Sequence, residues 1–308
     1  MTDSYEVVVV GGGAAGLSAA LVLGRSRRRT LVVDAGEPRN APSAHMQGYL
    51  SRDGMSPAAF LAVGREEIAR YGVELVRDRA VDAAGDGDFS VVLAGGRTVR
   101  ARQLVVATGL KDELPPVRGL AGRFGRDVVH CPYCHGWEVR DLPTGVLATT
   151  PLSVHQALMV TQWTKDVRLF LHEVSESQLT DDDLRRLAAA GVAVVPGAVA
   201  EVVVAGDRLT GVRLADGTVH DRRVLYAAPR AVPRTELLLR LGAEMRETPF
   251  GRYPVTDERG LTSVPGLWAA GNAGGFAEQV VNAASRGYRA GAAINGALLM
   301  ADLDGQVP

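Results

Sequence analysis

Residues 6–16, which read EVVVVGGGAAG, decide the fold of this chain. A short run of β-branched residues ends directly in a glycine turn, and an Ala- and Leu-rich stretch of helical composition follows to about Leu23. Residues 30–34 (TLVVD) then have the composition of a second strand. This order of strand, glycine turn, helix and strand predicts a βαβ unit that binds an adenine dinucleotide.

The glycines of this turn have separate roles in such a unit. Gly11 allows the tight turn, Gly13 lets a pyrophosphate approach the N-terminus of the helix, and Gly16 lets the helix pack closely on the strand. Asp34 follows Gly16 at about the spacing expected of the acid that binds a ribose. Four positions in register therefore predict a cofactor site in the N-terminal domain.

The composition is that of a globular protein and argues against several other classes. The 308 residues carry a formal net charge of -1, which argues against a nucleic-acid partner and against a polybasic membrane protein. No apolar run reaches the roughly 18 residues needed to cross a bilayer, so we expect no membrane contact. Residues 1–6 carry no basic leader segment, which leads us to expect a cytoplasmic protein.

Two proline-bearing joints divide the chain. They are residues 114–116 (LPP) and 228–233 (APRAVP), and paired joints predict that one domain is inserted in another. We therefore expect an α/β protein with two Rossmann-like, three-layer domains. Residues 1–115 and 234–308 are expected to form the first domain, and residues 116–233 the inserted second domain.

The chain has two cysteines, Cys131 and Cys134, in a C-x-x-C motif. A structural zinc ion needs four ligands, and the neighbouring His130 and His135 are badly placed to complete such a set around one C-x-x-C. We therefore expect no metal at this motif. In an α/β chain without a secretory leader the spacing favours a redox-active pair.

Four motifs in order resemble those of the low-molecular-weight thioredoxin reductase-like flavoproteins. They are GGGAAG at residues 11–16, ATG at residues 107–109, the C-x-x-C pair, and VPGLWAAGN at residues 264–272 with a following Gln279. This resemblance, which spans nearly the whole chain, implies FAD in the first domain, a flavin-adjacent disulfide on the second, and a homodimer.

The resemblance also implies which residues hold the cofactor. The ADP half of FAD is expected on the glycine turn and Asp34, the ribityl and pyrophosphate region beside Gly271 and Asn272, and the flavin ring at the helix that Gln279 opens. Asn272 stands where the family usually has Asp, and its carbonyl oxygen can still accept a hydrogen bond. The expected cofactor-binding residues are Gly11, Gly13, Ala14, Ala15, Gly16, Asp34, Ala107, Thr108, Gly109, Gly271, Asn272, Gln279 and Val280.

The second domain departs from the family where NADPH would bind. The family's G-x-G-x-x-A turn corresponds to ATTPLS at residues 148–153, so side chains occupy the space of the glycines and Pro151 removes an N–H donor. The family's H-R-R cluster corresponds to LHEV at residues 171–174, where Glu173 would repel the 2′-phosphate. These changes predict that NADPH is not used in the usual way.

The redox motif itself is intact. By the resemblance, Cys134 faces the flavin and Cys131 exchanges with an incoming dithiol. His135 stands where the family usually has Asp, and an imidazole can act as both acid and base near neutral pH. His130 and Glu138 are weaker candidates for this acid–base role.

An intact disulfide motif beside a degraded NADPH site resembles the dithiol oxidases of bacterial and fungal natural-product pathways, of gliotoxin or holomycin type. This resemblance implies a small-molecule dithiol substrate and dioxygen as the electron acceptor, which leaves as hydrogen peroxide. Two alternatives share the same motifs. One is a thioredoxin-disulfide reductase fed by NADPH or ferredoxin, and the other is a flavin redox sensor that turns nothing over.

Overall fold

A computed structural model of the chain describes residues 3–306. Met1 and Thr2 of the N-terminal segment considered above lie outside the described residues, as do the last two residues of the range 234–308. The chain forms two compact units. The first unit comprises the chain up to Ala41, Met55–Lys111 and the chain from Ala231 onward, and the second unit comprises Pro42–Gly54 and Asp112–Arg230.

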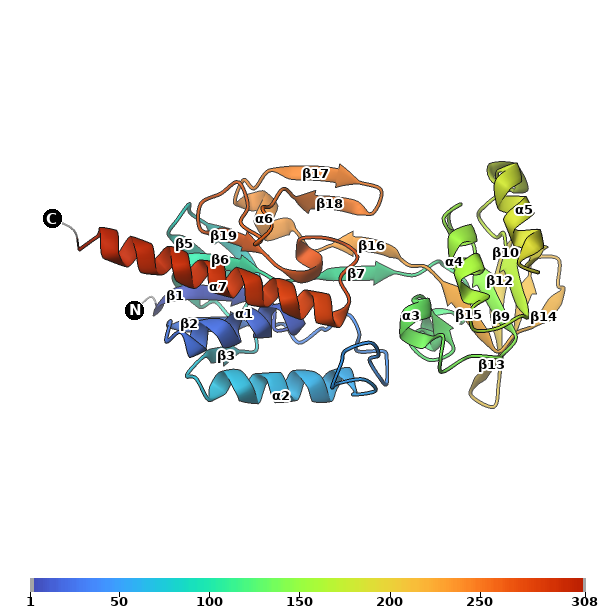
Figure 1. The fold of residues 1–308 in the computed structure, drawn as a ribbon, viewed down its shortest axis with the longest axis horizontal. Helices are drawn as coiled ribbons and strands as arrows, with labels where there is room; N and C mark the ends of the chain where they lie inside the picture. Colours follow the sequence, from blue (N-terminus) through green and yellow to red (C-terminus); the bar gives the residue numbers. More distant parts are fainter. Residues whose placement is uncertain (1–2, 307–308) are drawn as a thin grey trace. The chain divides into compact units, whose positions relative to one another are not determined.

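The first unit is built on a mixed sheet of seven strands (Figure 1). Its order is β3-β2-β1-β6-β5-β4, and β19 pairs with the second half of β6. The strands are β1 (Asp3–Val10), β2 (Thr30–Val33), β3 (Glu74–Val76), β4 (Ala80–Ala84), β5 (Phe89–Leu93), β6 (Thr98–Val106) and β19 (Leu267–Ala269). Strands β1, β2, β3, β19 and the end of β6 run parallel, which brings their carboxyl ends to one edge of the sheet.

Helices cover one face of this sheet. They are α1 (Ala14–Arg25), α2 (Pro57–Ala69) and α7 (Val280–Asp304), with α6 (Glu236–Arg240) packed on the other face beside β4. Because side chains alternate along a strand, Val7 and Val9 of β1 join the core under the helices, whereas Val8 and Val10 join the opposite core. Helices α7 and α1 lie side by side because Gly287 of α7 has no side chain; a Cβ there would overlap the backbone of α1.

The second unit repeats this plan on a smaller scale. Its parallel sheet has the order β11-β10-β9-β15-β8, with helices against one face and a three-stranded antiparallel sheet, β12-β13-β14, against the other. The strands are β8 (Val128–Val129), β9 (Thr144–Leu147), β10 (Val167–Phe170), β11 (Ala193–Val195), β12 (Val199–Ala205), β13 (Arg208–Leu214), β14 (Val219–Asp221) and β15 (Val224–Ala227). The helices are α3 (Pro132–His135), α4 (Ser153–Val160) and α5 (Asp181–Ala189).

Short elements complete the chain. Strands β7 (Leu110–Glu113) and β16 (Arg230–Pro233) lie at the two chain crossings and pair with each other, and β17 (Met245–Thr248) pairs with β18 (Gly251–Pro254). Three 3₁₀ turns are η1 (Ala121–Arg123), η2 (Glu176–Gln178) and η3 (Gly271–Ala273).

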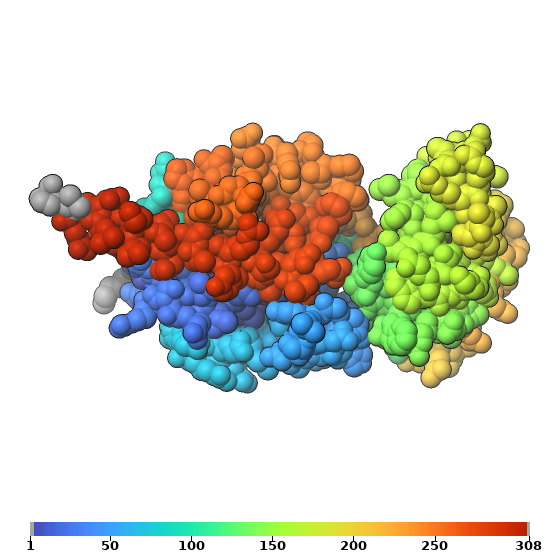
Figure 2. Space-filling view, in the orientation of Figure 1, coloured from blue at the N-terminus to red at the C-terminus, as the bar shows by residue number. Residues whose placement is uncertain are grey.

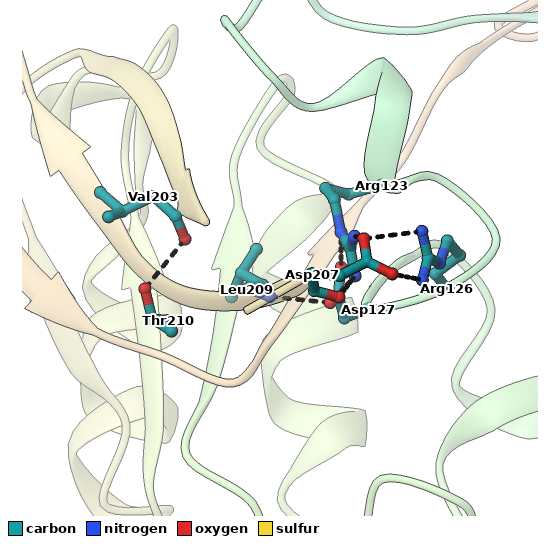
Figure 3. Close-up of polar contacts among 7 residues, drawn as sticks. All are labelled: Arg123, Arg126, Asp127, Val203, Asp207, Leu209 and Thr210. Atoms are coloured by element: carbon teal, nitrogen blue, oxygen red, sulfur yellow. Dashed lines mark hydrogen bonds and ion pairs between the residues drawn. The ribbon is translucent and has the colours of Figure 1, made fainter. Parts of the chain in front are cut away.

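A charge network braces the segment that leads to the cysteines (Figure 3). Arg123, only 6% exposed, donates to Asp127 through Nε at 2.7 Å and to Asp207 through Nη1 at 2.7 Å. Asp207 lies in the β12–β13 turn at φ +55°, and its carboxylate also accepts a hydrogen bond from Arg126. Asp127 accepts a hydrogen bond from the N–H of Leu209. Hairpin β12–β13 and strand β8 are thereby fixed to each other.

The expected fold class is confirmed: the chain is α/β, with a Rossmann-like sheet in each unit. Residues 42–54, inside the range 1–115 expected for the first domain, group with the second unit instead. Within residues 3–306, every helix is too short or too polar to span a lipid bilayer.

Candidate functional site: two βα turns and a disulfide

The glycine turn after β1 is shaped by two different demands. Gly11 has φ +112°, donates its N–H to the Val33 carbonyl at 2.8 Å, and has no room for a Cβ against the Ala107 carbonyl. A Cβ on Gly16 would overlap the Gly11 carbonyl. Gly13, the N-cap of α1, differs because a Cβ there would meet no atom within 4 Å. Gly11 and Gly16 are therefore required by packing, and Gly13 keeps the space at the helix N-terminus open.

This open helix end fits a pyrophosphate. The first amides of a helix point their N–H groups outward, and the helix dipole favours an anion there. No acidic side chain lies in the first turn of α1. The turn therefore provides the cradle that an adenine dinucleotide requires.

Asp34, at the end of β2, is 8% exposed and already holds four donors. Its Oδ1 accepts the N–H groups of Gly12 at 3.2 Å and Gly36 at 3.1 Å, while its Oδ2 pairs with Arg77 at 2.9 Å and Arg65 at 3.5 Å. A carboxylate has about four acceptor positions, so a ribose hydroxyl must share or replace one of these donors. Motif reading missed both arginines because they come from distant parts of the chain.

The other expected cofactor residues of the first unit gather at the same edge of the sheet. The Ala107 N–H donates to the Val10 carbonyl at 2.8 Å, and Thr108 Oγ1 donates to the Arg234 carbonyl at 2.6 Å. Gly271 has φ +64°, and a Cβ on it would lie 2.8 Å from the Cβ of Ala15. The ATG segment and Gly271 are thus both next to the glycine turn.

Asn272 fastens the segment that opens α7. Its Oδ1 accepts the N–H of Glu278 at 3.2 Å, and its Nδ2 donates to the Glu278 carbonyl at 3.4 Å. Gln279 is the N-cap of α7 and Val280 its first residue. An aspartate at position 272 could make the first bond but not the second, because a carboxylate has no N–H to donate.

Glu278 adds a half-buried charge pair at the same place, with the side chain of Arg286 47% exposed. Burial raises the pKa of its carboxyl group, and Arg286, whose Nε lies 2.8 Å away, acts in the opposite direction.

The redox pair lies in the second unit, directly after β8. Cys131 and Cys134 are joined by a disulfide, with their Cα atoms 5.2 Å apart. Cys131 is the N-cap of α3, and its Sγ accepts the N–H of Cys134 at 3.2 Å. Cys131 is 7% exposed, whereas Cys134 is partly exposed. A thiolate on Cys131 would keep the N–H bond, which is the type of contact that favours the charged form of a thiol.

His135 directly follows Cys134 and ends α3. Burial lowers its pKa, while the Cys131 backbone and the Glu138 carboxylate act in the opposite direction. Its buried Nδ1 has no hydrogen-bond partner. A neutral imidazole with a free nitrogen is suited to accept a proton. His130 directly precedes Cys131, and its backbone carbonyl accepts a hydrogen bond from Nε2 of Gln156 at 2.5 Å.

The second βα turn, after β9, closes on itself. The N–H of Ser153 donates to the Thr150 carbonyl at 3.0 Å, and the N–H of Val154 donates to the Pro151 carbonyl at 3.1 Å. These are the first amides of α4 and the groups a phosphate would bind. The Glu173 N–H also donates to the carbonyl of Ala148, the residue after β9, at 3.3 Å.

His172 precedes Glu173 in a strained position. Its φ is +49°, and Nδ1 accepts the Val199 N–H at 3.1 Å, so this nitrogen carries no proton. Burial lowers the pKa of the ring, although the carboxylate of Glu173 raises it. This segment therefore offers a neutral histidine and an anion where a nucleotide phosphate would need cations.

Comparisons with known proteins cover almost the whole chain. Residues 5–287 match the family described as pyridine nucleotide-disulphide oxidoreductase. Thioredoxin reductase sirT of Leptosphaeria maculans is 33% identical over an alignment of 321 positions, which covers 97% of this chain and 96% of that protein. The crystal structure of HlmI superimposes with a TM-score of 0.94 at 48% identity, covering 99% of this chain and 96% of that one. An oxidoreductase from Agrobacterium tumefaciens gives a TM-score of 0.90 at 38% identity, covering 97% and 99%.

Proposed function

Because the chain belongs to the pyridine nucleotide-disulphide oxidoreductase family, we propose that it oxidises small-molecule dithiols to cyclic disulfides and does not use NADPH. The chain is a flavin thiol/disulfide oxidoreductase. In this proposal the flavin is FAD and the final electron acceptor is dioxygen. The protein works in the cytoplasm. Reduced dithiol natural products are the substrate class.

The closed turn after β9 carries this proposal. Its first helix amides are bonded to the carbonyls of Thr150 and Pro151, and Pro151 has no N–H of its own. The carboxylate of Glu173, the residue after His172, adds a negative charge to this segment. The turn after β9 therefore offers no site for the phosphate of a nicotinamide nucleotide. The disulfide is still present and can accept electrons from thiols.

The cysteine pair performs the thiol–disulfide exchange. A substrate thiolate attacks Sγ of Cys131, the Cys131–Cys134 bond breaks, and Cys134 leaves as a thiolate. The second substrate thiol then attacks the substrate sulfur bound to Cys131, which releases the cyclic disulfide and the Cys131 thiolate. The substrate loses two electrons and two protons, and the cysteine pair gains the two electrons. Since Cys131 is largely buried, its Sγ must become accessible before the attack.

A histidine next to the cysteine pair in sequence transfers the proton. Neutral His135 accepts a proton from the substrate thiol and returns it to solvent. When bound, FAD supplies an acceptor for the two electrons of the cysteine pair and a donor to dioxygen, which leaves as hydrogen peroxide. The residues that would hold it are the glycine turn, the ATG segment and Gly271 with Asn272.

Anaerobic titration of the purified holoprotein tests the proposal. We expect a small dithiol such as dithiothreitol to bleach the flavin absorbance, and NADPH to leave it unchanged. Admission of air should then restore the colour and yield one hydrogen peroxide per dithiol. Cys131→Ser and Cys134→Ser should each retain flavin and lose turnover. Rapid bleaching by NADPH, or full activity of either serine variant, would overturn the proposal.

The names of the relatives favour a second candidate, reduction of a protein disulfide. That activity requires electrons to flow from a donor through the flavin to the cysteines, which is the opposite direction. Reduced ferredoxin or NADPH would then bleach the flavin faster than a dithiol does. A redox sensor that turns nothing over would be bleached by a dithiol but would consume no oxygen in the steady state.

A second copy of the chain is the protein partner that we propose. The surface of α7 is exposed along the first unit (Figure 2), and it presents Leu299, Met300 and Leu303 to solvent. A cavity of about 410 Å³ lies between this helix and residues 257–268. Exposed apolar side chains beside a hollow are typical of an interface between subunits. Light scattering of the eluted protein should give twice the mass of one chain.

A further inference from the structure

Two aromatic side chains, one in α3 and one in the turn that follows it, are exposed to solvent. Tyr133 is 71% exposed and Trp137 is 65% exposed. Neither is used by the exchange chemistry derived above. Large exposed aromatic side chains cost solvation free energy and commonly mark a binding surface.

Both residues lie on one face of the same helical segment. The turn continues beyond α3, because the Gly136 N–H donates to the Pro132 carbonyl at 2.7 Å and the Val139 N–H to the His135 carbonyl at 3.2 Å. Residues four apart share a face in such a segment. Trp137 follows Cys134 by three residues, or about 5 Å along the axis at 1.5 Å per residue. Tyr133 thus stands between the two cysteines in sequence, and Trp137 stands about one helical turn beyond Cys134.

The rings are held in place by their neighbours. Tyr133 packs edge-on against Trp163, with ring centroids 6.1 Å apart. The guanidinium of Arg140 lies 4.2 Å from the centroid of Trp137 and donates to the Trp137 carbonyl at 2.7 Å. One side of the indole is thus covered by a cation, and most of the remaining ring surface is open. Rings that are fixed in advance lose little entropy when a ligand stacks on them.

We propose that Tyr133 and Trp137 form a stacking platform that selects dithiols carrying a flat, conjugated ring, an inference that rests on the proposed dithiol oxidase activity. The size of the platform supports a small molecule. Two aromatic side chains offer about 300 Å², well below the roughly 800 Å² that each partner contributes to a stable protein interface. The exposed side chains next to Trp137 in sequence, Glu138, Arg140 and Asp141, are charged.

A matched pair of dithiols tests the platform. Dithiothreitol and 1,2-bis(mercaptomethyl)benzene both close to six-membered cyclic disulfides, but only the second has a flat ring. We expect Trp137→Ala to lower kcat/KM for the aromatic dithiol about tenfold, through KM, and to change that for dithiothreitol less than twofold. Trp137→Phe should restore most of the loss. Tyr71→Ala is the control, since the ring of Tyr71 lies in the first unit, 4.9 Å from the guanidinium of Arg25. This variant should leave kcat/KM unchanged for both dithiols.

The other outcomes each overturn the proposal. Equal losses for both dithiols would mean that Trp137 only supports α3 and its disulfide, and no loss would mean that no platform exists. A defect confined to oxidation of reduced thioredoxin would make the surface a protein-docking site.

If no dithiol reduces the flavin, the proposed function fails but the platform is still testable. Saturation-transfer NMR with the cyclic aromatic disulfide then decides. Transfer to the wild-type protein that is lost in Trp137→Ala supports the platform, and equal or absent transfer to both refutes it.

Discussion

One methyl group at Gly13 should separate the needs of the fold from those of the cofactor. Gly13 has φ -80° and ψ -173°, an extended conformation that alanine adopts without strain. A Cβ at this position meets no protein atom within 4 Å. Gly13→Ala therefore leaves the packing of the first unit intact while it places a methyl group where the pyrophosphate would approach.

The expected magnitudes differ between the two properties. Alanine in place of glycine stabilises a compatible site by about 0.4–1 kcal/mol through the unfolded chain, whereas alanine is the poorer N-cap by a similar amount. The two effects offset each other, so the free energy of unfolding of the apoprotein should stay within about 1 kcal/mol of wild type. An extra methyl in a filled site costs about 1–3 kcal/mol, which corresponds to FAD binding that is roughly fivefold to 150-fold weaker.

Two measurements on the apoprotein check this expectation. Urea denaturation gives stability, and quenching of FAD fluorescence gives the dissociation constant. Gly16→Ala is the contrasting control: its Cβ would overlap the Gly11 carbonyl and lie 3.3 Å from Val9 Cγ1, so the apoprotein itself should be destabilised. If Gly13→Ala binds FAD within twofold of wild type, the cofactor role of Gly13 is wrong. If it loses more than about 2 kcal/mol of stability, the fold itself requires this glycine.

Three further changes follow from contacts in both units. Arg123→Met leaves Asp127 without its buried partner and should destabilise the second unit by about 3 kcal/mol, seen as a lower urea midpoint. Asn272→Asp removes the donor to the Glu278 carbonyl; flavin should dissociate faster on dilution, while Asn272→Ser, which keeps a donor, should lie between the two. The pKa of His135 lies below 6.5 in the folded chain, so the unfolded chain binds more protons between the two pKa values and stability falls as pH drops below about 6.5. His135→Gln should reduce this loss, measured as the difference in urea midpoint between pH 7.5 and 5.5.

Local patterns of the sequence were sufficient for the fold class. The strand, turn and helix expected from residue 6 onward correspond to β1 and α1, and residues 30–33 form β2. Each of these elements depends on neighbours in sequence: β-branched residues favour a strand, and glycines permit the turn. The packing roles of Gly11 and Gly16 follow from the same geometry, because a βαβ unit always brings the turn against the adjacent strand.

Contacts between segments that are distant along the chain could not be predicted from the sequence. Nothing near Asp34 in sequence indicates that Arg65 and Arg77 will occupy its Oδ2, because both arginines approach only after the sheet has formed. The grouping of residues 42–54 with the second unit has the same origin. The lower exposure of Cys131 relative to Cys134 also depends on tertiary packing, and the C-x-x-C spacing alone carries no information about it.

The chain contains the same βα turn twice, and the difference between the two turns carries its chemistry. After β1, Gly13 leaves the helix end open, so that a ligand can reach the outward amides. After β9, the carbonyls of Thr150 and Pro151 take up the corresponding amides of α4. The second sheet is nevertheless complete, and its strand β8 leads directly to the disulfide. We infer that the second unit keeps its nucleotide-binding architecture as a rigid support for the cysteine pair. In the proposed reaction, electrons enter through thiols at that pair.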